Sequence, residues 1–565
     1  MLKDKILNKF ILNTMKKRGR QAIGELDVNC ENAIKKSEEL LLKLIDDNKD
    51  TEYGRKYNFK DIHSIEDYKK NVPFSVYDDY APYIERMIKN DENNLISVYP
   101  AVHYAVSSGS VGVPKSIPVS EATIECYKKY SCNLVFGLMD EYYRNKFGKS
   151  YANGKGLNTL EVREMRTDNG IIKGPISSTT SRANKKFLPY VFSSPMEIVF
   201  TNEVMDLKYL QLRFGLEERN LSFMIGAFMT SLVDLMTYMN ANWKSLCDEI
   251  EKGILNKDAH IPENVRKELE VYLKPNPKRA EELREEFEKG FDTPIIPRIW
   301  KNMSWIFAIG TGGFASYTEK MRKYSGNIPI DFSVYGASEA LMAVARNVEE
   351  GEFVLIPDSG FYEFVPMDSD DEDVTYTIDE LEVGKDYEII VTNLSGFYRY
   401  RIKDVIRVTG FHKQSPKIKF VYRKNQMISI AGEKTNDEAV SWAVSEFAKE
   451  TGCKISDYSI EADTDCEPGR YVVYLEPDHI MDSDKMEEYT KLIEEKLSIA
   501  NPSFGAKVKN GVLSKTVLYF LQQETYALYR DLMIMRGVSG NQLKPVRVID
   551  TPMKKKFFSA LVEKE

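Results

Sequence analysis

Hydrophobic residues recur at helical spacing at the start of the chain. Leu2, Ile6, Phe10 and Ile11 fall on one face of a helix whose neighbouring positions carry lysines. This pattern predicts a basic amphipathic helix packed on the body of the protein, with contact to a membrane surface as the alternative. The lysines interrupt the apolar residues and no small-residue cleavage site follows, so the segment is not expected to be a signal peptide.

Further along, the hydrophobic period switches repeatedly between that of strands and that of helices. Residues 97–119 predict a strand followed by a glycine-rich loop, and residues 121–139 return to helical spacing. Residues 198–250 predict a strand and then long helices, residues 304–347 alternate again, and residues 351–410 are mostly strand-like. Such alternation predicts an α/β protein whose large N-terminal domain has β-sheets flanked by helices.

The last part of the chain has a different organisation. Residues 435–565 mix helical and strand patterns, which predicts a separate, smaller α+β domain. We place the boundary near Arg423–Asn425, so that an N-terminal domain spans residues 1–424 and a C-terminal domain spans residues 425–565. A length of 565 residues fits more than one domain.

Composition narrows the function classes. Lys and Arg number 78 against 86 Asp and Glu, a formal net charge of −8, so neither nucleic acid nor an anionic membrane is an expected partner. No apolar run approaches the ~20 residues that span a bilayer. The six cysteines lack CxxC spacing and the five histidines do not cluster, which indicates a reducing, cytoplasmic environment and argues against a Cys- or His-based metal centre.

Three short segments carry residues suited to binding a nucleotide. The first runs from Ser107 to Lys115 and contains Ser107, Ser108, Gly109, Ser110 and Lys115. Glycines let the backbone N–H groups approach phosphate oxygens, hydroxyls donate further hydrogen bonds, and the lysine supplies charge. The spacing is that of neither a P-loop nor a nucleophile elbow, so this segment alone could equally be an ordinary flexible loop.

The second and third segments add an acidic residue each. Tyr335–Glu339 follows an apolar, strand-like run, and Glu339 offers a hard oxygen ligand for magnesium while Tyr335 offers a flat face for a base. Tyr398–Val405 contains Asp404, which is suited to accept hydrogen bonds from ribose hydroxyls. Taken singly, Glu339 could be a satisfied turn carboxylate, and Asp404 could be paired with the neighbouring arginines.

Taken together, SSGSxGxxK, YGASE and YRYRxxD resemble, in order and separation, the nucleotide-binding motifs of the acyl-acid amido synthetases. This family conjugates auxin or jasmonate to amino acids and belongs to the adenylate-forming superfamily. The segments SSPMEIVFTNEVMDLKYLQLRFGL and NQLKPVRVI extend the resemblance over most of the chain. It implies the adenylate-forming fold and a reaction in which ATP activates a carboxylic acid as acyl-AMP, after which an amine, expected to be an amino acid, accepts the acyl group. It also implies that the N-terminal domain, residues 1–424, serves adenylation and acyl binding, and that the C-terminal domain, residues 425–565, is mobile.

The resemblance also assigns roles to individual residues. The ATP-binding residues would be Ser107, Ser108, Gly109, Ser110, Lys115, Thr311, Gly312, Tyr335, Ser338 and Asp404, and Glu339 would hold Mg²⁺. Lys434 and Lys544 match lysines that approach the phosphates from the C-terminal domain. Two positions depart from the family pattern: Ser110 replaces a threonine and keeps the hydroxyl, whereas Lys403 stands at a usual glycine and would either crowd the nucleotide or point to solvent.

The acyl pocket is the least determined part of the site. The stretch Met224–Leu235, read as helical, is expected to line it through Met224, Phe228 and Leu232, although these residues could equally be plain core. No feature names the acid or the amine, and no obligate protein partner is evident. Two other functions stay open: acyl transfer to a thiol such as coenzyme A or a carrier protein, and a non-catalytic nucleotide-binding protein.

Overall fold

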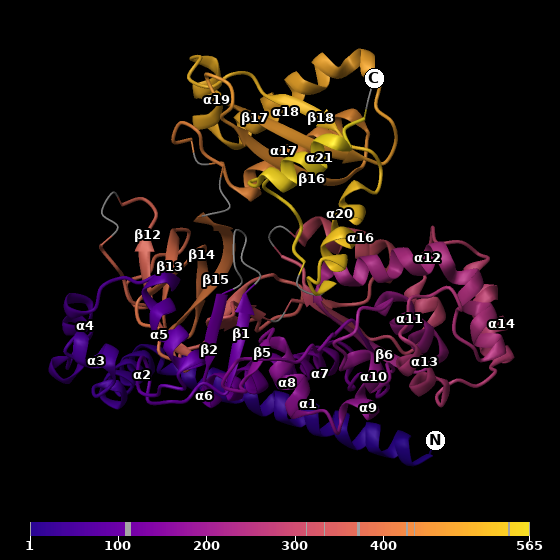
Figure 1. The fold of residues 1–565 in the computed structure, drawn as a ribbon, viewed down its shortest axis with the longest axis horizontal. Helices are drawn as coiled ribbons and strands as arrows, with labels where there is room; N and C mark the ends of the chain where they lie inside the picture. The colour runs from indigo at the N-terminus through magenta and orange to yellow at the C-terminus, as the bar shows by residue number, and fades with distance from the viewer. Residues whose placement is uncertain are drawn as a thin grey trace. The chain divides into compact units, whose positions relative to one another are not determined.

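The computed structural model describes residues 2–107, 115–311, 314–332, 334–369, 373–424, 428–433, 435–540 and 543–563 (Figure 1). Contacts within the chain divide it into two compact units. The first comprises Met1–Ile402 and Ile406–Phe420, and the second comprises Lys403–Val405 and Val421–Glu565. A domain boundary after residue 424 and mobility of the C-terminal domain stay predictions.

A parallel four-stranded sheet forms one half of the first unit. Its strands lie in the order β3 (Lys155–Asn158), β6 (Leu221–Phe228), β7 (Trp305–Ile309) and β8 (Ile330–Asp331). The strand register aligns Leu157, Met224, Ile306 and Ile330 in one transverse row. These four side chains are buried in the core that also contains helix α12 (Met229–Lys252).

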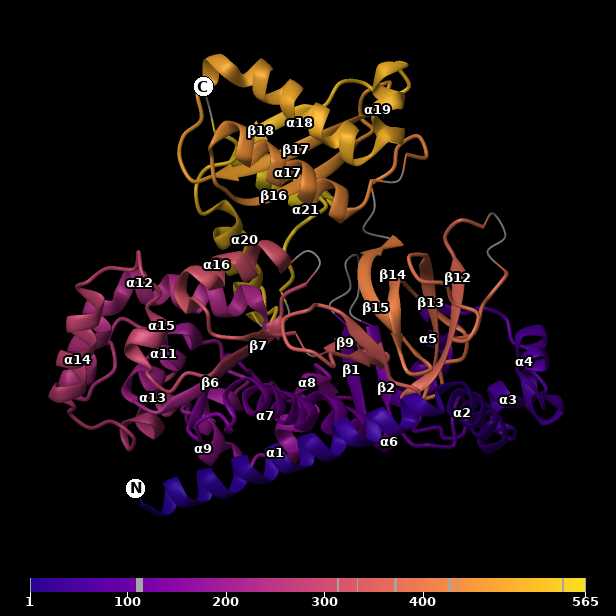
Figure 2. The same cartoon turned by 180° about the vertical axis from the view of Figure 1, so that it is seen from behind.

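Helices cover both faces of this sheet. On the face with the core row lie α11 (Leu207–Glu217), α12, α14 (Pro277–Phe287) and α16 (Ala315–Ser325), while α1 (Leu2–Glu31), α7 (Leu134–Phe147) and α9 (Leu188–Val191) lie on the other (Figure 2). Smaller helices complete this half: α8 (Ser177–Ala183), α10 (Met196–Val199), α13 (Glu263–Glu270) and α15 (Ile296–Ile299).

The other half of the first unit is built on two further sheets. One has the strand order β2 (Lys115–Val119), β1 (His103–Ser107), β5 (Ile172–Gly174) and β4 (Met165–Arg166). The other has the order β12 (Gly360–Pro366), β13 (Asp386–Asn393), β14 (Tyr400–His412), β15 (Ser415–Arg423), β11 (Phe353–Leu355), β10 (Leu341–Val344) and β9 (Val334–Gly336). The helices here are α2 (Ala33–Asn48), α3 (Glu52–Lys56), α4 (Ile65–Asn71), α5 (Tyr77–Lys89) and α6 (Glu121–Tyr127), with one turn η1 (Phe59–Asp61) and one π-helix η2 (Lys128–Asn133).

Helix α1 is confirmed as a helix packed on the body of the protein, where Ile11 contacts the core, but Ile6 and Phe10 of the predicted face do not. Ile6 and Phe10 are 61% and 69% exposed, whereas Asn8, Leu12 and Lys16 are buried. The reason is hydrogen bonding: Asn8 Nδ2 donates to the Tyr190 carbonyl at 2.7 Å, and Lys16 Nζ donates to the Tyr151 carbonyl at 2.9 Å. Burial of polar groups is tolerated when their hydrogen bonds are made.

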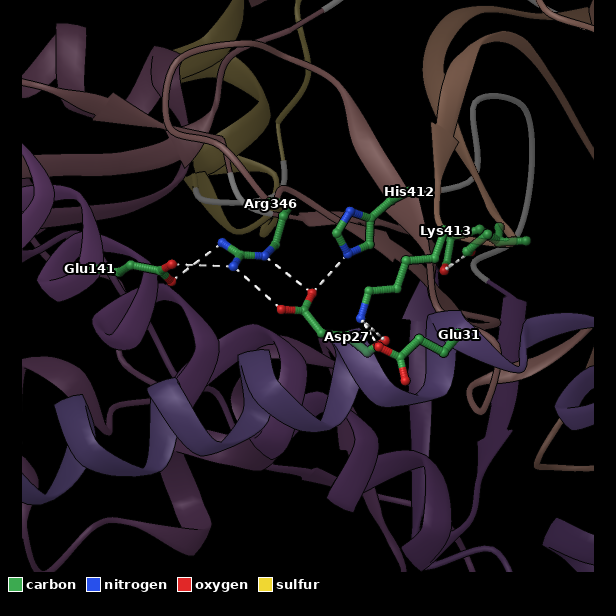
Figure 3. Close-up of polar contacts among 8 residues, drawn as sticks. Asp27, Glu31, Glu141, Arg346, His412 and Lys413 are labelled. Carbon is green, nitrogen blue, oxygen red and sulfur yellow. Dashed lines mark hydrogen bonds and ion pairs between the residues drawn. The ribbon is translucent and has the colours of Figure 1, made fainter.

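The C-terminal part of α1 is held by charged groups from three other segments. Arg346, which follows β10, lies between Asp27 of α1 and Glu141 of α7, and His412 Nε2 lies 2.8 Å from Asp27 Oδ1 (Figure 3). Lys413 donates to the Asp27 carbonyl at 2.8 Å. Burial opposes ionisation of Asp27, but the hydrogen bonds from Arg346 and His412 outweigh it and lower its pKa. This network ties α1 to the β14–β15 turn.

Elsewhere the predicted strands over residues 351–410 are confirmed as β11, β12, β13 and β14. Two predictions around β6 are wrong. The strand expected from residue 198 is the short helix α10 followed by irregular chain, and Met224–Phe228, expected to be helical, belongs to β6. Both faces of a parallel strand are covered, so its continuous apolar run is hard to distinguish from that of a buried helix.

The second unit has a three-stranded sheet in the order β16 (Ile455–Asp463), β17 (Arg470–Pro477), β18 (Val517–Phe520). Its helices are α17 (Asp437–Thr451), η5 (Ser483–Lys485), α18 (Met486–Ala500), α19 (Pro502–Lys509), α20 (Thr525–Met535) and α21 (Pro552–Ala560). The α+β character predicted for this part is therefore observed. None of the helices described in either unit combines the length and apolarity that crossing a bilayer requires.

Candidate active site

The first nucleotide-binding segment connects two antiparallel strands. Ser107 ends β1 and is paired with Lys115, which begins β2. Ser108, Gly109 and Ser110, predicted to contact ATP, lie outside the described residues. The register therefore brings the two ends of the loop together, and Lys115 Nζ lies 5.0 Å from the centre of the Tyr77 ring.

The second segment forms the turn between β9 and β10, and neighbouring elements fix its backbone. Asn393 Nδ2 donates to the Glu339 carbonyl at 2.8 Å, and the Tyr127 hydroxyl donates to the Ala337 carbonyl at 2.7 Å. Ser338 and the Glu339 side chain remain partly exposed. The turn is thus held by β13 and α6 while its functional side chains stay accessible.

Tyr335 is more buried than a free stacking face would be. Its side chain is 8% exposed, and its ring centre lies 6.1 Å from those of Phe353 and Phe420. One part of the ring therefore belongs to the core of the seven-stranded sheet. The predicted contact with a base would use the remaining face or edge.

The second and third segments meet at Tyr400 and Glu339. The Tyr400 hydroxyl donates to Glu339 Oε1 at 3.4 Å. Burial and the neighbouring Glu339 carboxylate raise the pKa of Tyr400, so the phenol keeps its proton and acts as a donor. This contact orients the carboxylate that the sequence assigns to magnesium.

The arginines of the third segment are paired with other carboxylates than Asp404. Arg399 Nη2 lies 2.9 Å from Glu363 Oε1, and Arg401 Nη2 lies 2.7 Å from Glu388 Oε2. Asp404 is 2% exposed and accepts a 2.5 Å hydrogen bond from Arg423 Nε. Asp404 is therefore paired with an arginine, as one reading of the sequence anticipated, but with one on the adjacent strand β15.

A short extended segment connects the first and third motifs. Ser75 exchanges backbone hydrogen bonds with Arg399 and Arg401, at 3.0 and 2.9 Å. Two residues later, the Tyr77 hydroxyl accepts a hydrogen bond from the Ser116 amide at 3.0 Å. Together with the Tyr127 and Tyr400 contacts, these bonds bring the described parts of the three motifs in the first unit into one neighbourhood.

The backbone conformation at Lys403 explains why the family usually has a glycine at this position. Its φ angle is +66°, in the left-handed region that glycine enters at little cost, and its side chain is exposed. Of the two alternatives that the sequence left open, an outward-pointing side chain is the one observed.

The lysine-bearing segment of the second unit is anchored at one end. Lys544 is exposed, and three residues later Arg547 Nη1 donates to Asp457 Oδ1 at 2.5 Å while its guanidinium lies 4.1 Å from the centre of the Tyr458 ring. Val548 forms a parallel bridge with Ile460 of β16. Lys434, the other predicted lysine, lies outside the described residues, as does Gly312; Thr311, directly before Gly312, is partly buried.

The residues predicted to line the acyl pocket separate into two groups. Met224 and Leu232 are fully buried in the core of the parallel sheet, so we leave them out of the pocket. Phe228 is partly exposed and stacks on Phe314 with ring centres 4.9 Å apart. No sequence pattern marks Tyr77, Tyr127 or Asn393, because single tyrosines and asparagines outside a motif give no signal.

The α/β fold and the described parts of the three motifs agree with the class of acyl acid amido synthetases, as comparison with known proteins shows. A solved structure named GH3.15 acyl acid amido synthetase superimposes with a TM-score of 0.84 at 26% identity, covering 96% of this chain and 97% of that one. Models of the GH3 family match the N-terminal domain at residues 22–330, the central domain at residues 353–423 and the C-terminal domain at residues 438–553. The chain therefore belongs to the GH3 family.

Curated relatives align with this chain over nearly its whole length. An indole-3-acetic acid-amido synthetase GH3.8 of Oryza sativa subsp. indica is 29% identical, covering 94% of this chain and 90% of the relative. A 4-substituted benzoates-glutamate ligase GH3.12 of Arabidopsis thaliana is also 29% identical, covering 92% and 95%. The resemblance stated from the sequence is thereby confirmed, and so is the predicted fold class.

Proposed function

We propose that this protein activates a carboxylic acid with ATP and transfers the acyl group to an amine, forming an amide. The relatives named above are amido synthetases and an acid–amino acid ligase, which supports a C–N bond-forming ligase. The observation that carries the proposal is the meeting of the Tyr335–Glu339 turn, Tyr400 and the β1–β2 hairpin in one neighbourhood.

The chemistry explains why a nucleotide is needed. A carboxylate is a poor electrophile, because its leaving group would be oxide. Attack of the carboxylate on the α-phosphate of ATP gives acyl-AMP and pyrophosphate, and attack of an amine on the acyl carbon then releases AMP. Negative charge grows on phosphate oxygens in the first step, so fixed donors and cations in the site accelerate it.

The residues of the candidate site are suited to binding Mg²⁺, the nucleotide and the acid. Glu339 is a partly exposed, hydrogen-bonded carboxylate, a hard oxygen ligand suited to Mg²⁺, which would neutralise phosphate charge when bound. Lys115 and the glycine-rich loop would contact the phosphates, Tyr335 and Ser338 the nucleotide, and Asp404 the ribose. Thr311 and Gly312 would lie near adenine, and Phe228 would contact the acid.

The C-terminal lysines complete the proposal. Lys544 and Lys434 would stabilise the charge on the phosphates during adenylation. Movement of the C-terminal domain between the two half-reactions would then withdraw Lys544 before the amine attacks. We also keep a cytoplasmic location as part of the proposal, because all six cysteines are free.

The test is a screen for ATP–pyrophosphate exchange over a library of carboxylic acids. Acids that support exchange would then be incubated with pooled amino acids, and products identified by mass spectrometry. Amide formation together with AMP release is expected. Exchange with no acid, despite binding of Mg·ATP, would contradict the proposal and favour a non-catalytic nucleotide-binding protein.

Transfer to a thiol is the second candidate, and the same acids separate it from amide formation. Product yields would be compared with amino acids and with coenzyme A as acceptors. A thioester product in place of an amide would overturn the choice of acceptor while leaving the adenylation step intact.

A further inference from the structure

The parallel sheet carries a second transverse row, one position after the core row and on the opposite face. Asn158 is paired with Ile225, Ile225 with Phe307, and Phe307 with Asp331. Residues paired on neighbouring strands point to the same side of a sheet. We call these four residues the carboxyl-end row: Asn158 and Asp331 end β3 and β8, Ile225 lies in the second half of β6, and Phe307 lies at the middle of β7. The carboxyl ends of the strands are the usual place for a ligand in such sheets.

Helix α7 and the π-helix η2 that precedes it cover this face. Phe136 packs on Phe223 with ring centres 5.3 Å apart, and the Tyr143 hydroxyl donates to the carbonyl of Ser304, just before β7, at 2.6 Å. Helix α7 therefore runs antiparallel to the strands. Residues 131–133, three to five positions before Phe136, lie about 4.5–7.5 Å from it along the helix axis, toward the carboxyl ends of the strands. Ile225 lies two residues beyond Phe223, about 6.6 Å in the same direction.

The π-helix therefore lies over the carboxyl-end row. The side chains of Ser131, Cys132 and Asn133 in η2, and of Ile225 and Phe307 in the row, are only partly buried. These side chains therefore retain some exposed surface. π-Helical turns occur frequently at functional sites.

The end of the row at β3 has buried polar groups without partners. Asn158 is 0% exposed, and neither its Oδ1 nor its Nδ2 has a hydrogen-bond partner within the described part of the chain. The hydroxyl of Ser194, which is 1% exposed, also has none there. Phe192 is bridged in parallel to Gly156, so the register places Ser194 level with Asn158. Buried polar groups are costly unless a ligand or a water completes their hydrogen bonds.

The β8 end of the carboxyl-end row is close in sequence to residues of the predicted nucleotide site. Thr311 follows two residues after the end of β7, and Tyr335 follows four residues after the end of β8. We propose that the acyl chain of the acid lies along the carboxyl-end row, with its carboxylate toward β8, and that Asn158 hydrogen-bonds a polar group at its far end. This inference rests on the proposed function.

The length and the side chains of the carboxyl-end row determine which class of acid would fit it. Three strand spacings separate Asp331 from Asn158, about 14 Å between backbones. Ile225 and Phe307 in the middle suit an apolar or aromatic body. The carboxamide of Asn158 offers one donor group and one acceptor, and a hydroxyl satisfies both. The expected substrate is therefore an acid with an apolar body and a hydroxyl distant from the carboxylate.

The experiment measures kcat/KM for ATP–pyrophosphate exchange with matched acids, using the full chain. The pairs are 3-phenylpropanoic and 3-(4-hydroxyphenyl)propanoic acid, and octanoic and 8-hydroxyoctanoic acid. The wild type is expected to prefer the hydroxylated member of an accepted pair by at least about 10-fold, the order expected for a lost buried hydrogen bond. N158L should abolish or reverse that preference by lowering kcat/KM for the hydroxylated acid alone, and S194A should reduce it less.

Thr230 provides the matched control. Its hydroxyl is also buried without a partner in the described residues, but it belongs to α12, the helix that packs on the face of the core row. T230V should leave the preference between paired acids unchanged. Should T230V erase the preference as fully as N158L does, the effect would be general to the fold and the inference would be overturned.

Other outcomes also decide the matter. Equal losses for both acids in N158L, or no preference in the wild type, would show that Asn158 holds only a buried water or supports the fold. Exchange with other library acids but with neither pair would overturn the inference while leaving the proposed function standing. Exchange with no acid at all would instead remove the proposed function, and the inference with it.

Discussion

The Tyr400 hydroxyl reaches Glu339 Oε1 across 3.4 Å and so joins the second nucleotide-binding motif to the third. Tyr400 begins β14 and Glu339 lies in the turn after β9, on strands that are far apart in the order of the seven-stranded sheet. The bond helps to fix the orientation of the Glu339 carboxylate. Glu339 would therefore be oriented before the Mg²⁺ proposed above binds.

Replacing Glu339 by Gln should lower adenylation strongly. Loss of one group that stabilises transition-state charge typically costs about 10²–10³ in rate. The measurement is ATP–pyrophosphate exchange across a magnesium titration, with thermal unfolding as a check on folding. Y400F, which removes only the orienting bond, should cost less than about 10-fold. Exchange at the wild-type rate in E339Q would exclude Glu339 as the magnesium ligand.

Replacing Lys544 by Met should affect the two half-reactions differently. Adenylation should fall by about 10²–10³ because a phosphate-stabilising charge is lost, whereas transfer from isolated acyl-adenylate to the amine should keep its rate. Single-turnover assays of each half-reaction measure this. Lys556, exposed on α21 of the same unit, supplies the control K556M, which should alter neither step. Equal losses in both half-reactions would argue against alternation of the C-terminal domain.

Asp404 is paired with Arg423 and is also proposed to bind the ribose, and the variants D404N and R423Q separate these two roles. Both remove the ion pair between these two buried or partly buried side chains, so each should lower the free energy of unfolding by about 1–3 kcal/mol. Only D404N should also raise the KM for ATP, by roughly 10-fold, if the carboxylate binds the ribose. Unfolding in denaturant and initial rates at varied ATP check the two effects. An unchanged KM in D404N would leave Asp404 as a purely structural partner of Arg423.

Replacing Lys403 by Gly should stabilise the protein. A non-glycine residue in the left-handed region costs about 1–2 kcal/mol, and part of this is offset by the entropy that glycine loses on folding. The expected net gain is about 0.5–1 kcal/mol in the free energy of unfolding, with adenylation unchanged because the side chain is exposed. Lys413 has a φ of +58° but also binds Glu31, so K413G should gain less. Destabilisation by K403G would show that the lysine makes a favourable contact.

His103 should make folding sensitive to mild acid. Burial, and secondarily the charge of Arg182, lower its pKa to about 4. Between about pH 6.5, the ordinary value, and pH 4 the unfolded chain binds a proton that the folded chain does not, so stability falls as the pH falls. The shift corresponds to about 3 kcal/mol. Urea unfolding at several pH values should show a flatter profile for H103Q than for the wild type, and parallel profiles would contradict the assignment.

Part of the site could be predicted from sequence because motifs are local. The residue types in SSGSxGxxK, YGASE and YRYRxxD are dictated by phosphate, cation and ribose chemistry, so their order sufficed to identify the family, and the amide-forming ligase agrees with the relatives. Partners outside motifs were not predictable. Tyr127 and Asn393 fix the Glu339 turn from more than 50 residues away, and no local pattern marks them.

The sequence by itself determined the α/β class, the α+β C-terminal part and the three nucleotide-binding segments, because hydrophobic period and motif chemistry act over a few neighbouring residues. Only the tertiary structure decided that Met224 and Leu232 belong to the core, that Lys16 rather than Ile6 faces inward, and that Asn158 lies buried and unpaired in the described chain. The physical reason is that these outcomes depend on which strands become neighbours and in what register. A shift of one residue moves a side chain to the other face of a sheet.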